Sequence, residues 1–307
     1  MIADDIWRQG PAVVNAHIRD LIARAVPPIP EQQMAPIRVE ERDGKIARIS
    51  DEDSGLRADD LDFEGWREPV LDHVNELLNG DFRSGTNHGR VWDRLEALAA
   101  LLPGAIPEVE AQQFRIGYEI ERLEGLLAAY RSGSEDMPEL NAAVLEDLGR
   151  LHLALKMGIE KLERWADFRR QAIESLPQVA EVDRAVVADA IDTVVVEMAL
   201  QSKFFNAELP RSFGYLIKAL RDPRGATKVI VYGAATSVEN VIAFLGRTAL
   251  GVAKGGIEDA AKVITKALAA TLLAGLSAAA FSISQAVPGS MPWLLPLLET
   301  LKLAAKR

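Results

Sequence analysis

The 307-residue chain contains no cysteine. This absence excludes disulfide bonds, thiolate nucleophiles, cysteine-held iron–sulfur clusters and zinc sites built on cysteine. It agrees with a reducing compartment, so we expect a cytoplasmic protein, at the inner face of the membrane if it meets one. The first ten residues, MIADDIWRQG, hold two acids and neither a basic nor a long apolar stretch. We therefore do not expect secretion through a signal peptide.

Histidine is scarce as well, and its spacing does not indicate a metal site. The four histidines are His17, His73, His88 and His152. None stands in an HExxH or ExxH pattern, the helical spacings that bring two ligands to one metal. The nearest grouping is His73 with Asp72 and Glu76, which the polar face of an amphipathic helix explains. The acidic loop Ser50–Asp62 repeats part of a calcium loop, but it lacks the flanking helices and the twelfth-position glutamate.

Motifs for other chemistry are also missing. The chain has neither a G-x-S-x-G nucleophile elbow nor a GxGxxG loop, and Gly225–Lys228 lacks the order of a P-loop. Carboxylate pairs such as Asp189 and Asp192 are too common in an acidic helical protein to indicate acid–base catalysis. We expect a protein that is not an enzyme, with no catalytic residues, no cofactor and no bound metal.

Charge is distributed unevenly, and this divides the chain. The net charge of −10 is made up of −4 over residues 1–60, −11 over residues 61–220 and +5 over residues 221–307. Asp222–Gly225 (DPRG) is a structural break where the sign changes. We predict an N-terminal helix with a β-hairpin (1–60), an acidic helical bundle (61–221) and a basic, apolar C-terminal region (222–307). The acidic body, and the lack of aromatics among the C-terminal cations, argue against nucleic-acid binding.

Residues 267–298 contain no Asp, Glu, Lys or Arg. Ala267–Val287 is close to the roughly 20 residues that cross a bilayer as a helix. Pro288-Gly289 then breaks the run before a second short apolar segment. The run is rich in alanine, serine and glycine, so its insertion into lipid would be marginal. Two interpretations remain: a membrane-associated segment, or a buried central helix of a bundle.

The membrane interpretation assigns roles to individual residues. Basic residues flank the run on both sides, which favours a re-entrant or interfacial arrangement with both flanks on one face of an anionic membrane. The predicted membrane contacts are Leu268, Leu272, Leu273, Leu276, Phe281, Ile283, Trp293, Leu294 and Leu295. The predicted headgroup contacts are Arg247, Lys254, Lys262, Lys266, Lys302, Lys306 and Arg307.

Two helical patterns offer self-association. Small residues recur on one stripe at Ala267, Thr271, Gly275 and Ala279, a spacing that lets two helix backbones approach closely. Apolar residues in steps of three and four over Glu139–Leu176 form a heptad seam, typical of a coiled coil or a long bundle helix. We expect either pattern to support a homo-oligomer, although packing within the chain is the commoner use.

The remaining periodicity predicts helices through most of the chain. Glu139–Leu176 and the helix after it are expected to form a long antiparallel hairpin. Thr236–Glu239 has capping-box spacing and is expected to begin a helix. The other predicted helices are Gly10–Val26, Glu68–Leu78, His88–Leu102, Glu108–Arg131, Val179–Phe205 and Ser212–Arg221.

Ile37–Ile49 is the one convincing β signal, with Asp43-Gly44 at its turn. A two-residue loop would pair apolar with polar residues. A loop one residue longer, with Gly44 in a G1 bulge, pairs Ile37 with Ile49, Val39 with Ala47 and Glu41 with Lys45. We predict this second register, because it gathers the apolar side chains on one face.

The sequence therefore predicts a mainly α fold: a helical bundle with a long helical hairpin, one small N-terminal β-hairpin and an apolar C-terminal helical segment. The alanine-rich, arginine-rich composition suggests a bacterial source. We expect a non-enzymatic, membrane-associated or membrane-active helical protein, an effector acting through its C-terminal helices. The alternative is a soluble scaffold or adaptor whose apolar C-terminal helices form the core.

Overall fold

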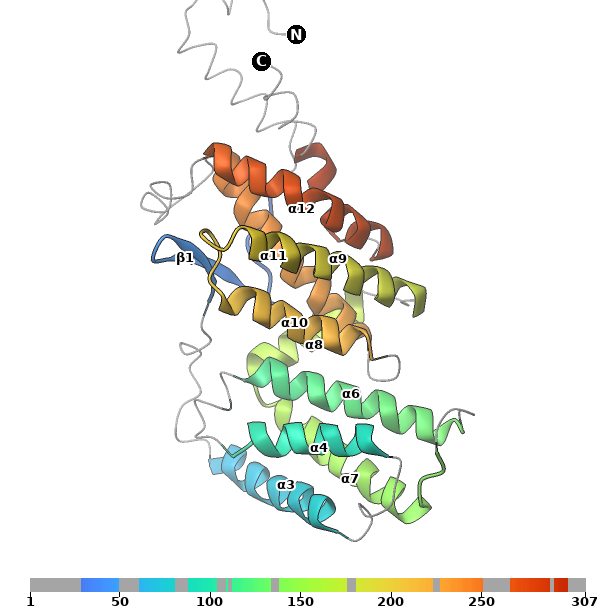
Figure 1. Ribbon diagram of the computed structural model, residues 1–307. Helices are drawn as coiled ribbons and strands as arrows, with labels where there is room; N and C mark the ends of the chain where they lie inside the picture. The colour runs from blue at the N-terminus through green and yellow to red at the C-terminus, as the bar shows by residue number, and fades with distance from the viewer. Residues whose placement is uncertain are drawn as a thin grey trace, which may run out of the picture.

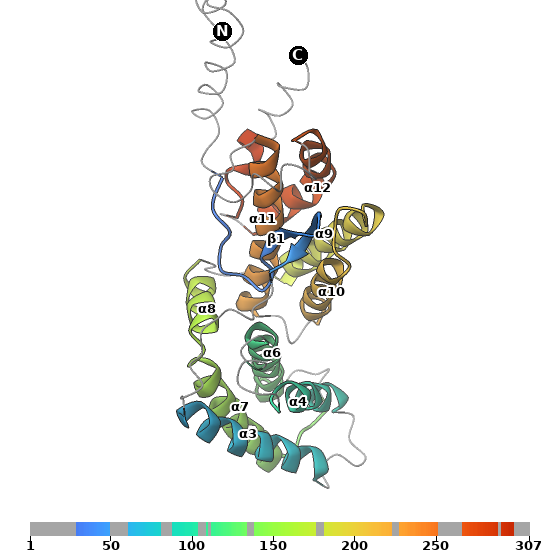
Figure 2. The ribbon, with the colours of Figure 1, turned by 90° about the vertical axis from the view of Figure 1, so that its left-hand side faces the viewer.

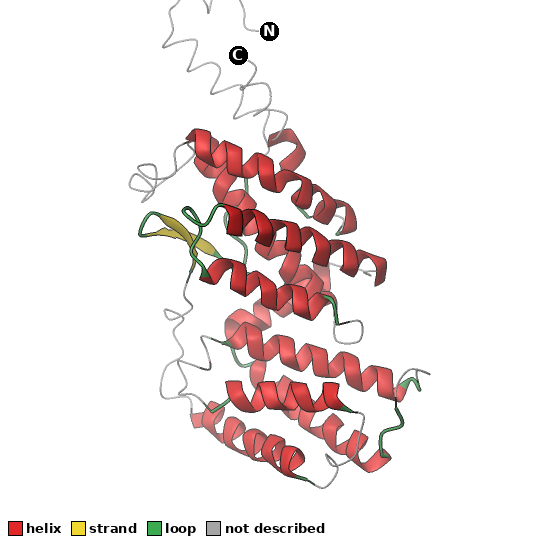
Figure 3. Cartoon of the chain, in the orientation of Figure 1, coloured by secondary structure: helices red, strands yellow, loops and turns green. Residues whose placement is uncertain are grey.

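The structure is a computed structural model that describes residues 29–49, 61–80, 88–103, 109, 112–133, 138–175, 181–222, 227–250, 266–287 and 290–297. The chain is mainly α, with one small two-stranded antiparallel hairpin near the N-terminus, as predicted (Figure 3). The expected helix Gly10–Val26 lies outside the described residues, as does the acidic loop up to residue 60.

The helices form a long stack from α3 at one end to α12 at the other (Figure 1). The first group is α3 (Leu61–Asn79), α4 (Gly89–Leu101), α6 (Gln113–Arg131) and α7 (Ala142–Ile159). The second is α8 (Glu163–Ser175), α9 (Glu181–Leu200), α10 (Glu208–Leu220), α11 (Lys228–Leu250) and α12 (Lys266–Ala286). Several bounds differ from prediction: α3 begins at Leu61 and takes Pro69 into its interior, α6 begins at Gln113, α9 ends at Leu200 and α10 begins at Glu208.

Helix α11 is the centre of the packing. It contacts α6, α8, α9, α10, α12 and β1. Figure 2 shows α11 between α8 on one side and α9 and α10 on the other. One buried apolar cluster therefore runs through all three sequence segments, from Ile37 to Leu297.

The predicted continuous helix Glu139–Leu176 is wrong, because the chain turns between α7 and α8. Leu162 N donates to Ile159 O over 3.1 Å, a tight hydrogen bond that ends the α-helical ladder. The two halves then pack on different partners, α7 on α3 and α6, and α8 on α6 and α11. Heptad spacing recorded the apolar positions but not this change of partner, and Ile173 beyond the turn is 48% exposed.

The predicted hairpin of this helix with the next is therefore also wrong. Helix α9 packs against α10, α11 and α12. Among consecutive helices, the most extensive packing joins α6 with α7, α9 with α10, and α11 with α12. Long helical pairs are thus present, formed from other helices than those expected.

The hairpin of β1 (Val39–Arg42) and β2 (Lys45–Arg48) uses the two-residue loop, so the predicted bulged register is wrong. Val39 pairs with Arg48 and Arg42 with Lys45. Asp43 and Gly44 both have positive φ, 52° and 74°, as a type I′ turn requires. Protein covers the hairpin on both faces, so burying Ile46 and Ala47 on opposite sides is not a conflict.

A third segment completes this small sheet. Ile46 N donates to Phe204 O over 2.7 Å, and Asn206 N donates to Ile46 O over 2.8 Å. These bonds place Phe205 beside Ile46 as a parallel bridge. The edge of β2 is therefore occupied by the connection between α9 and α10, which satisfies backbone groups that would otherwise need a partner.

The predicted helix start at Thr236–Glu239 is wrong, because α11 begins at Lys228 and passes through this tetrapeptide. Thr236 Oγ1 donates back to Tyr232 O over 2.8 Å. Ser237 and Asn240 bind the segment before β1 instead of capping a helix. The polar residues at these positions make contacts between buried segments. The same residue types occur at helix caps, so the sequence pattern fits both roles.

Candidate functional site

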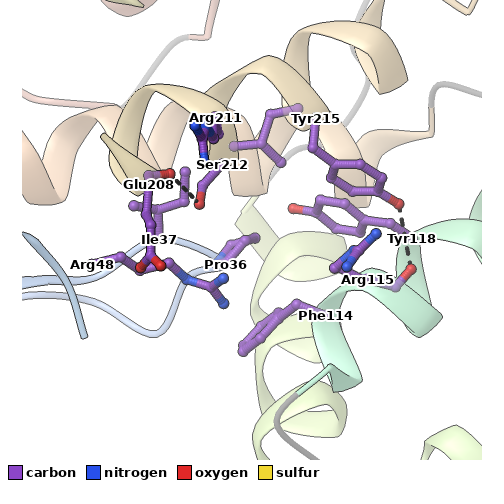
Figure 4. A pocket seen from close by; sticks show the side chains of 11 residues that line it. Pro36, Ile37, Arg48, Phe114, Arg115, Tyr118, Glu208, Arg211, Ser212 and Tyr215 are labelled. Atoms are coloured by element: carbon purple, nitrogen blue, oxygen red, sulfur yellow. Dashed lines mark hydrogen bonds between the residues drawn. The ribbon is translucent and has the colours of Figure 1, made fainter. Parts of the chain in front are cut away.

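A hollow in the described part of the chain lies where the segment before β1, the end of β2, α6 and α10 meet (Figure 4). Its volume is about 460 Å³, within the range of small-molecule sites. The lining residues are Pro36, Ile37, Arg48, Phe114, Arg115, Tyr118, Glu208, Arg211, Ser212, Tyr215 and Leu216.

Two tyrosines from different helices form one wall. The rings of Tyr118 on α6 and Tyr215 on α10 lie parallel, 8° apart in plane with centroids separated by 6.4 Å. The Tyr215 hydroxyl donates to Glu119 Oε1 over 2.8 Å. Burial raises the pKa of both tyrosines, and for Tyr215 the neighbouring Glu119 carboxylate raises it further. Both phenols therefore stay neutral at physiological pH and can serve as hydrogen-bond donors but not as bases.

Tyr118 is fixed by the close approach of α11. A Cβ atom on Gly233 would come within 1.7 Å of the Tyr118 hydroxyl oxygen and 2.8 Å of the Phe168 ring. Only glycine leaves room for the tyrosine at this position. The Tyr118 hydroxyl is buried and has no hydrogen-bond partner among the described residues.

Three arginines and one glutamate give the hollow a local positive charge in an acidic protein. They come from three elements: Arg48 from β2, Arg115 from α6, and Arg211 with Glu208 from α10. The Arg115 guanidinium lies 5.6 Å from the centroid of the Tyr215 ring. Within the part of the chain that the structure describes, neither Arg115 nor Arg211 forms an ion pair.

A buried ion cluster lies behind the tyrosine wall. Glu119 accepts from Arg94 Nη1 over 2.7 Å and from Arg122 Nη1 over 3.2 Å. Arg122 Nη2 also donates to Asp222 Oδ2 over 3.0 Å. Through Tyr215 this cluster joins α4, α6 and α10, so the hollow has a rigid back wall.

Most of the predicted membrane contacts on and after α12 are buried in the protein, whereas lipid-facing side chains would be exposed. Leu268 falls outside the described side chains, and Phe281 and Leu295 are exposed, at 41% and 51%. The other six are buried in the protein: Leu272, Leu273, Leu276, Ile283, Trp293 and Leu294. Helix α12 packs on α9 and α11, so the four of these residues on α12 can reach lipid only if the helix leaves that packing.

Among the described residues, one stretch is long and apolar enough to cross a bilayer, Lys228–Thr248 of α11. Several side chains at the start of the predicted stretch Ala267–Val287 lie outside the described set. Protein buries 94% of the α11 stretch. A core helix meets the same criteria of length and composition, so this finding alone is weak evidence for a span.

Of the predicted headgroup cations, the side chain of Arg247 is described. Its Nη1 donates to Pro30 O over 2.7 Å, and burial lowers its pKa. This arginine therefore points at the protein backbone rather than at solvent. Lys266 begins α12, with its side chain outside the described set, and Lys254, Lys262, Lys302, Lys306 and Arg307 lie outside the described residues altogether.

The patterns expected to support self-association are partly used inside the chain. Ala279 of the small-residue stripe is buried, and a Cβ on Gly275 would lie 3.6 Å from Glu197 Oε2 of α9. The seam residues of α7 face α3 and α6; buried among them are Leu148, Leu151, Leu155 and Ile159.

The polar partner of His73 lies outside the predicted grouping of His73, Asp72 and Glu76. His73 Nε2 lies 3.2 Å from Asp147 Oδ1 of α7, and His88 Nδ1 lies 2.8 Å from the Tyr130 hydroxyl. Within the described residues, no three or more His, Asp or Glu side chains gather as a metal site would need.

Comparisons with protein-family models, curated proteins and solved structures found no match to this chain.

Sequence reasoning missed the hollow, because its walls come from three segments far apart in the chain. One faint signal existed. Arg115 precedes Tyr118 on α6, and Arg211 precedes Tyr215 on α10, in each case by one helical turn. An arginine and a tyrosine at this spacing share a helix face, and two such faces can meet.

Proposed function

We propose that the chain is a non-enzymatic helical scaffold or adaptor protein whose apolar C-terminal helices form its core. The observation that carries this proposal is the burial of α11, a long apolar helix, among six other elements. A bundle built in this way presents fixed helix faces to partners and keeps its apolar helices inside.

Two polar connections support the proposal, since they tie the N-terminal segment and the C-terminal segment to α11. The Asn240 side chain accepts from Gln33 N over 2.8 Å and donates to Ile37 O over 3.1 Å. Trp293 Nε1 donates to Glu239 Oε1 over 2.8 Å. Residues distant in the sequence thus depend on one helix for their position.

Truncation tests this arrangement. We expect residues 1–222 alone to lose cooperative thermal unfolding, measured by circular dichroism, because α6, α8, α9, α10 and β1 would lose the apolar surface of α11. In the full chain, Ile242→Asp in the buried face of α11 should abolish folding, whereas Ala278→Asp on the exposed face of α12 should not. Cooperative unfolding of residues 1–222 at the full-length temperature would overturn the proposal.

A second candidate function is membrane association through the outer face of α12. The exposed positions of this helix are uncharged, among them Gly275, Ala278, Phe281 and Gln285. An uncharged face with an exposed phenylalanine suits an interfacial helix, and an effector would act through it. Self-association through the same face would give a homo-oligomer.

Vesicle flotation tests this candidate. The full chain should float with vesicles containing phosphatidylglycerol, and Phe281→Asp with Leu295→Asp should prevent it. Flotation that survives both changes, or full-length protein that stays with the soluble fraction at every vesicle concentration, would reject the membrane role. Light scattering of the same variants separates loss of membrane binding from loss of self-association.

A further inference from the structure

We propose that the hollow between the β-hairpin, α6 and α10 binds a small organic monocarboxylate with an apolar body. This inference goes beyond the scaffold role and does not depend on it, because the site would bind its ligand whether or not the protein recruits partners. It rests on the positive charge at the rim of the hollow and on the apolar side chains of its inner wall.

The charge of the lining selects an anion. Arg115 and Arg211 outnumber Glu208, the one carboxylate of the lining, in a chain whose net charge is −10. Arg115 and Arg211 reach the hollow from different helices, and neither is neutralised by an ion pair within the described residues. Guanidinium groups bind carboxylates through paired, charge-assisted hydrogen bonds.

Glu208 restricts the number of charges that the ligand carries. Its carboxylate belongs to the same rim as Arg211, one helical turn away on α10. A second negative charge on the ligand would meet this carboxylate at the rim, where like charges repel. The rim therefore favours a monocarboxylate over a di- or polyphosphate.

The inner wall requires an apolar body. Pro36, Ile37, Phe114 and Leu216 line the hollow together with the two tyrosine rings (Figure 4). Ile37 and Phe114 also belong to the buried core, so this wall is held in place by packing behind it. Burial of an apolar ligand surface against such a wall supplies the affinity, while the arginines orient the charged end.

A neighbouring hollow is also rich in cations, and three of its arginines already have acidic partners. It is lined by Arg94, Arg122 and Arg221 among others. Arg94 and Arg122 are paired with Glu119, and Arg122 also with Asp222. Arg221 pairs with aspartates of α9. Arg90 and Lys218 also line this second hollow, but its one apolar side chain is Ile217, so it lacks the apolar wall that lies beside Arg115 and Arg211.

The test measures binding of defined probes to the full-length protein by isothermal titration calorimetry. The probes are 3-phenylpropionate, its neutral amide 3-phenylpropionamide, and inorganic phosphate. We expect saturable one-to-one binding of the carboxylate, about tenfold weaker binding of the amide, and no competition from phosphate. Equal binding of acid and amide, or no saturation by the carboxylate at millimolar concentration, would overturn the proposal.

Matched variants assign the binding to this hollow. Arg211→Gln and Arg115→Gln should each weaken carboxylate binding about tenfold, whereas Arg170→Gln, on the exposed face of α8 and paired with Asp167, should leave it unchanged. Glu208→Gln should tighten it, because a repelling charge is removed. Arg211 is exposed, so its variant should keep the wild-type unfolding temperature. If Arg170→Gln weakens binding as much as Arg211→Gln, the anion is bound by general surface charge and the assignment fails.

Discussion

Trp293 donates a hydrogen bond from its indole nitrogen to the carboxylate of Glu239, over 2.8 Å and in a buried environment. The backbone of Met291, a residue held at a positive φ of 52°, also hydrogen-bonds this carboxylate. One charged side chain of α11 therefore fixes the last described segment of the chain. The fold retains a buried charge here in exchange for this attachment.

Glu239 should make stability depend on pH. Burial raises its pKa above the ordinary value of 4.5, although the bonds from Trp293 and Met291 oppose the shift. A carboxyl group with a raised folded pKa contributes stability that is full below its unfolded pKa and is lost as the pH rises through the folded pKa. Glu239→Gln keeps an acceptor for Trp293 without the charge. Its free energy of unfolding should therefore exceed that of the wild type at about pH 8 and approach it at about pH 5.

Urea titrations at the two pH values measure this difference. Glu146→Gln is the control, since Glu146 is exposed and pairs with Arg150 at the surface. A Glu239→Gln effect that is the same at both pH values would show that the carboxyl group does not titrate as proposed.

Gly158→Ala should destabilise the protein by about 1–3 kcal/mol, because the new methyl group overpacks a filled site. A Cβ there would lie 1.7 Å from Cε2 of Trp66, whose indole nitrogen donates to Ala154 O over 2.6 Å. Gly65→Ala is the matched change, also from glycine to alanine in a helix. Nothing lies within 4 Å of its Cβ, so it should stabilise by about 0.5–1 kcal/mol. Thermal unfolding that ranks these two variants in the opposite order would contradict the packing of Trp66 on α7.

Asn240→Ala should release the segment before β1. The substitution leaves half-buried backbone groups of Gln33 and a buried carbonyl of Ile37 without a partner, at a cost of about 1–3 kcal/mol. Hydrogen exchange at the Gln33 amide should quicken more than exchange in the core of α6. Thr193→Ala serves as the control, because Thr193 is exposed on α9 and bonds within its own helix. Unchanged protection at Gln33 would mean that packing alone holds the segment.

Glu119→Gln should cost about 3–5 kcal/mol, because it leaves two buried guanidinium groups with one carboxylate fewer. Arg94 and Arg122 are both nine-tenths buried or more, so solvent cannot replace the lost charge. Asp167→Asn removes a carboxylate from an exposed ion pair with Arg170 and should change stability by less than about 1 kcal/mol. Chemical denaturation of both variants gives the comparison, and equal losses would argue against a special role for the buried cluster.

Much of the helical architecture could be predicted from the sequence, because the buried face of an amphipathic helix places an apolar residue every three or four positions. The hairpin was located correctly from Asp43-Gly44, but its register was not. The register prediction assumed that the hairpin has one buried face, whereas Phe205, α10 and α11 cover the hairpin from several sides. The break after Ile159 was invisible for a related reason: apolar spacing does not say which partner a helix packs against.

The candidate site could not be predicted in the same way. Its arginines and tyrosines stand on α6, α10 and β2, and only the tertiary fold brings them together. The apolar stretch of residues 267–298, by contrast, is evident in the sequence because it contains no Asp, Glu, Lys or Arg. Its burial follows from the surfaces that α9 and α11 present, which a residue-by-residue hydropathy pattern does not contain.

The Ile46–Phe205 bridge and the Asn240 bonds have a consequence for how the protein is made. A ribosome delivers residues 33–48 long before Phe205 and Asn240 have been synthesised. The nascent β-hairpin therefore has no permanent neighbour, and a lone hairpin is marginal in water. Its final ordering must wait until most of the polypeptide has emerged, so residues 33–48 are among the last parts to become fixed.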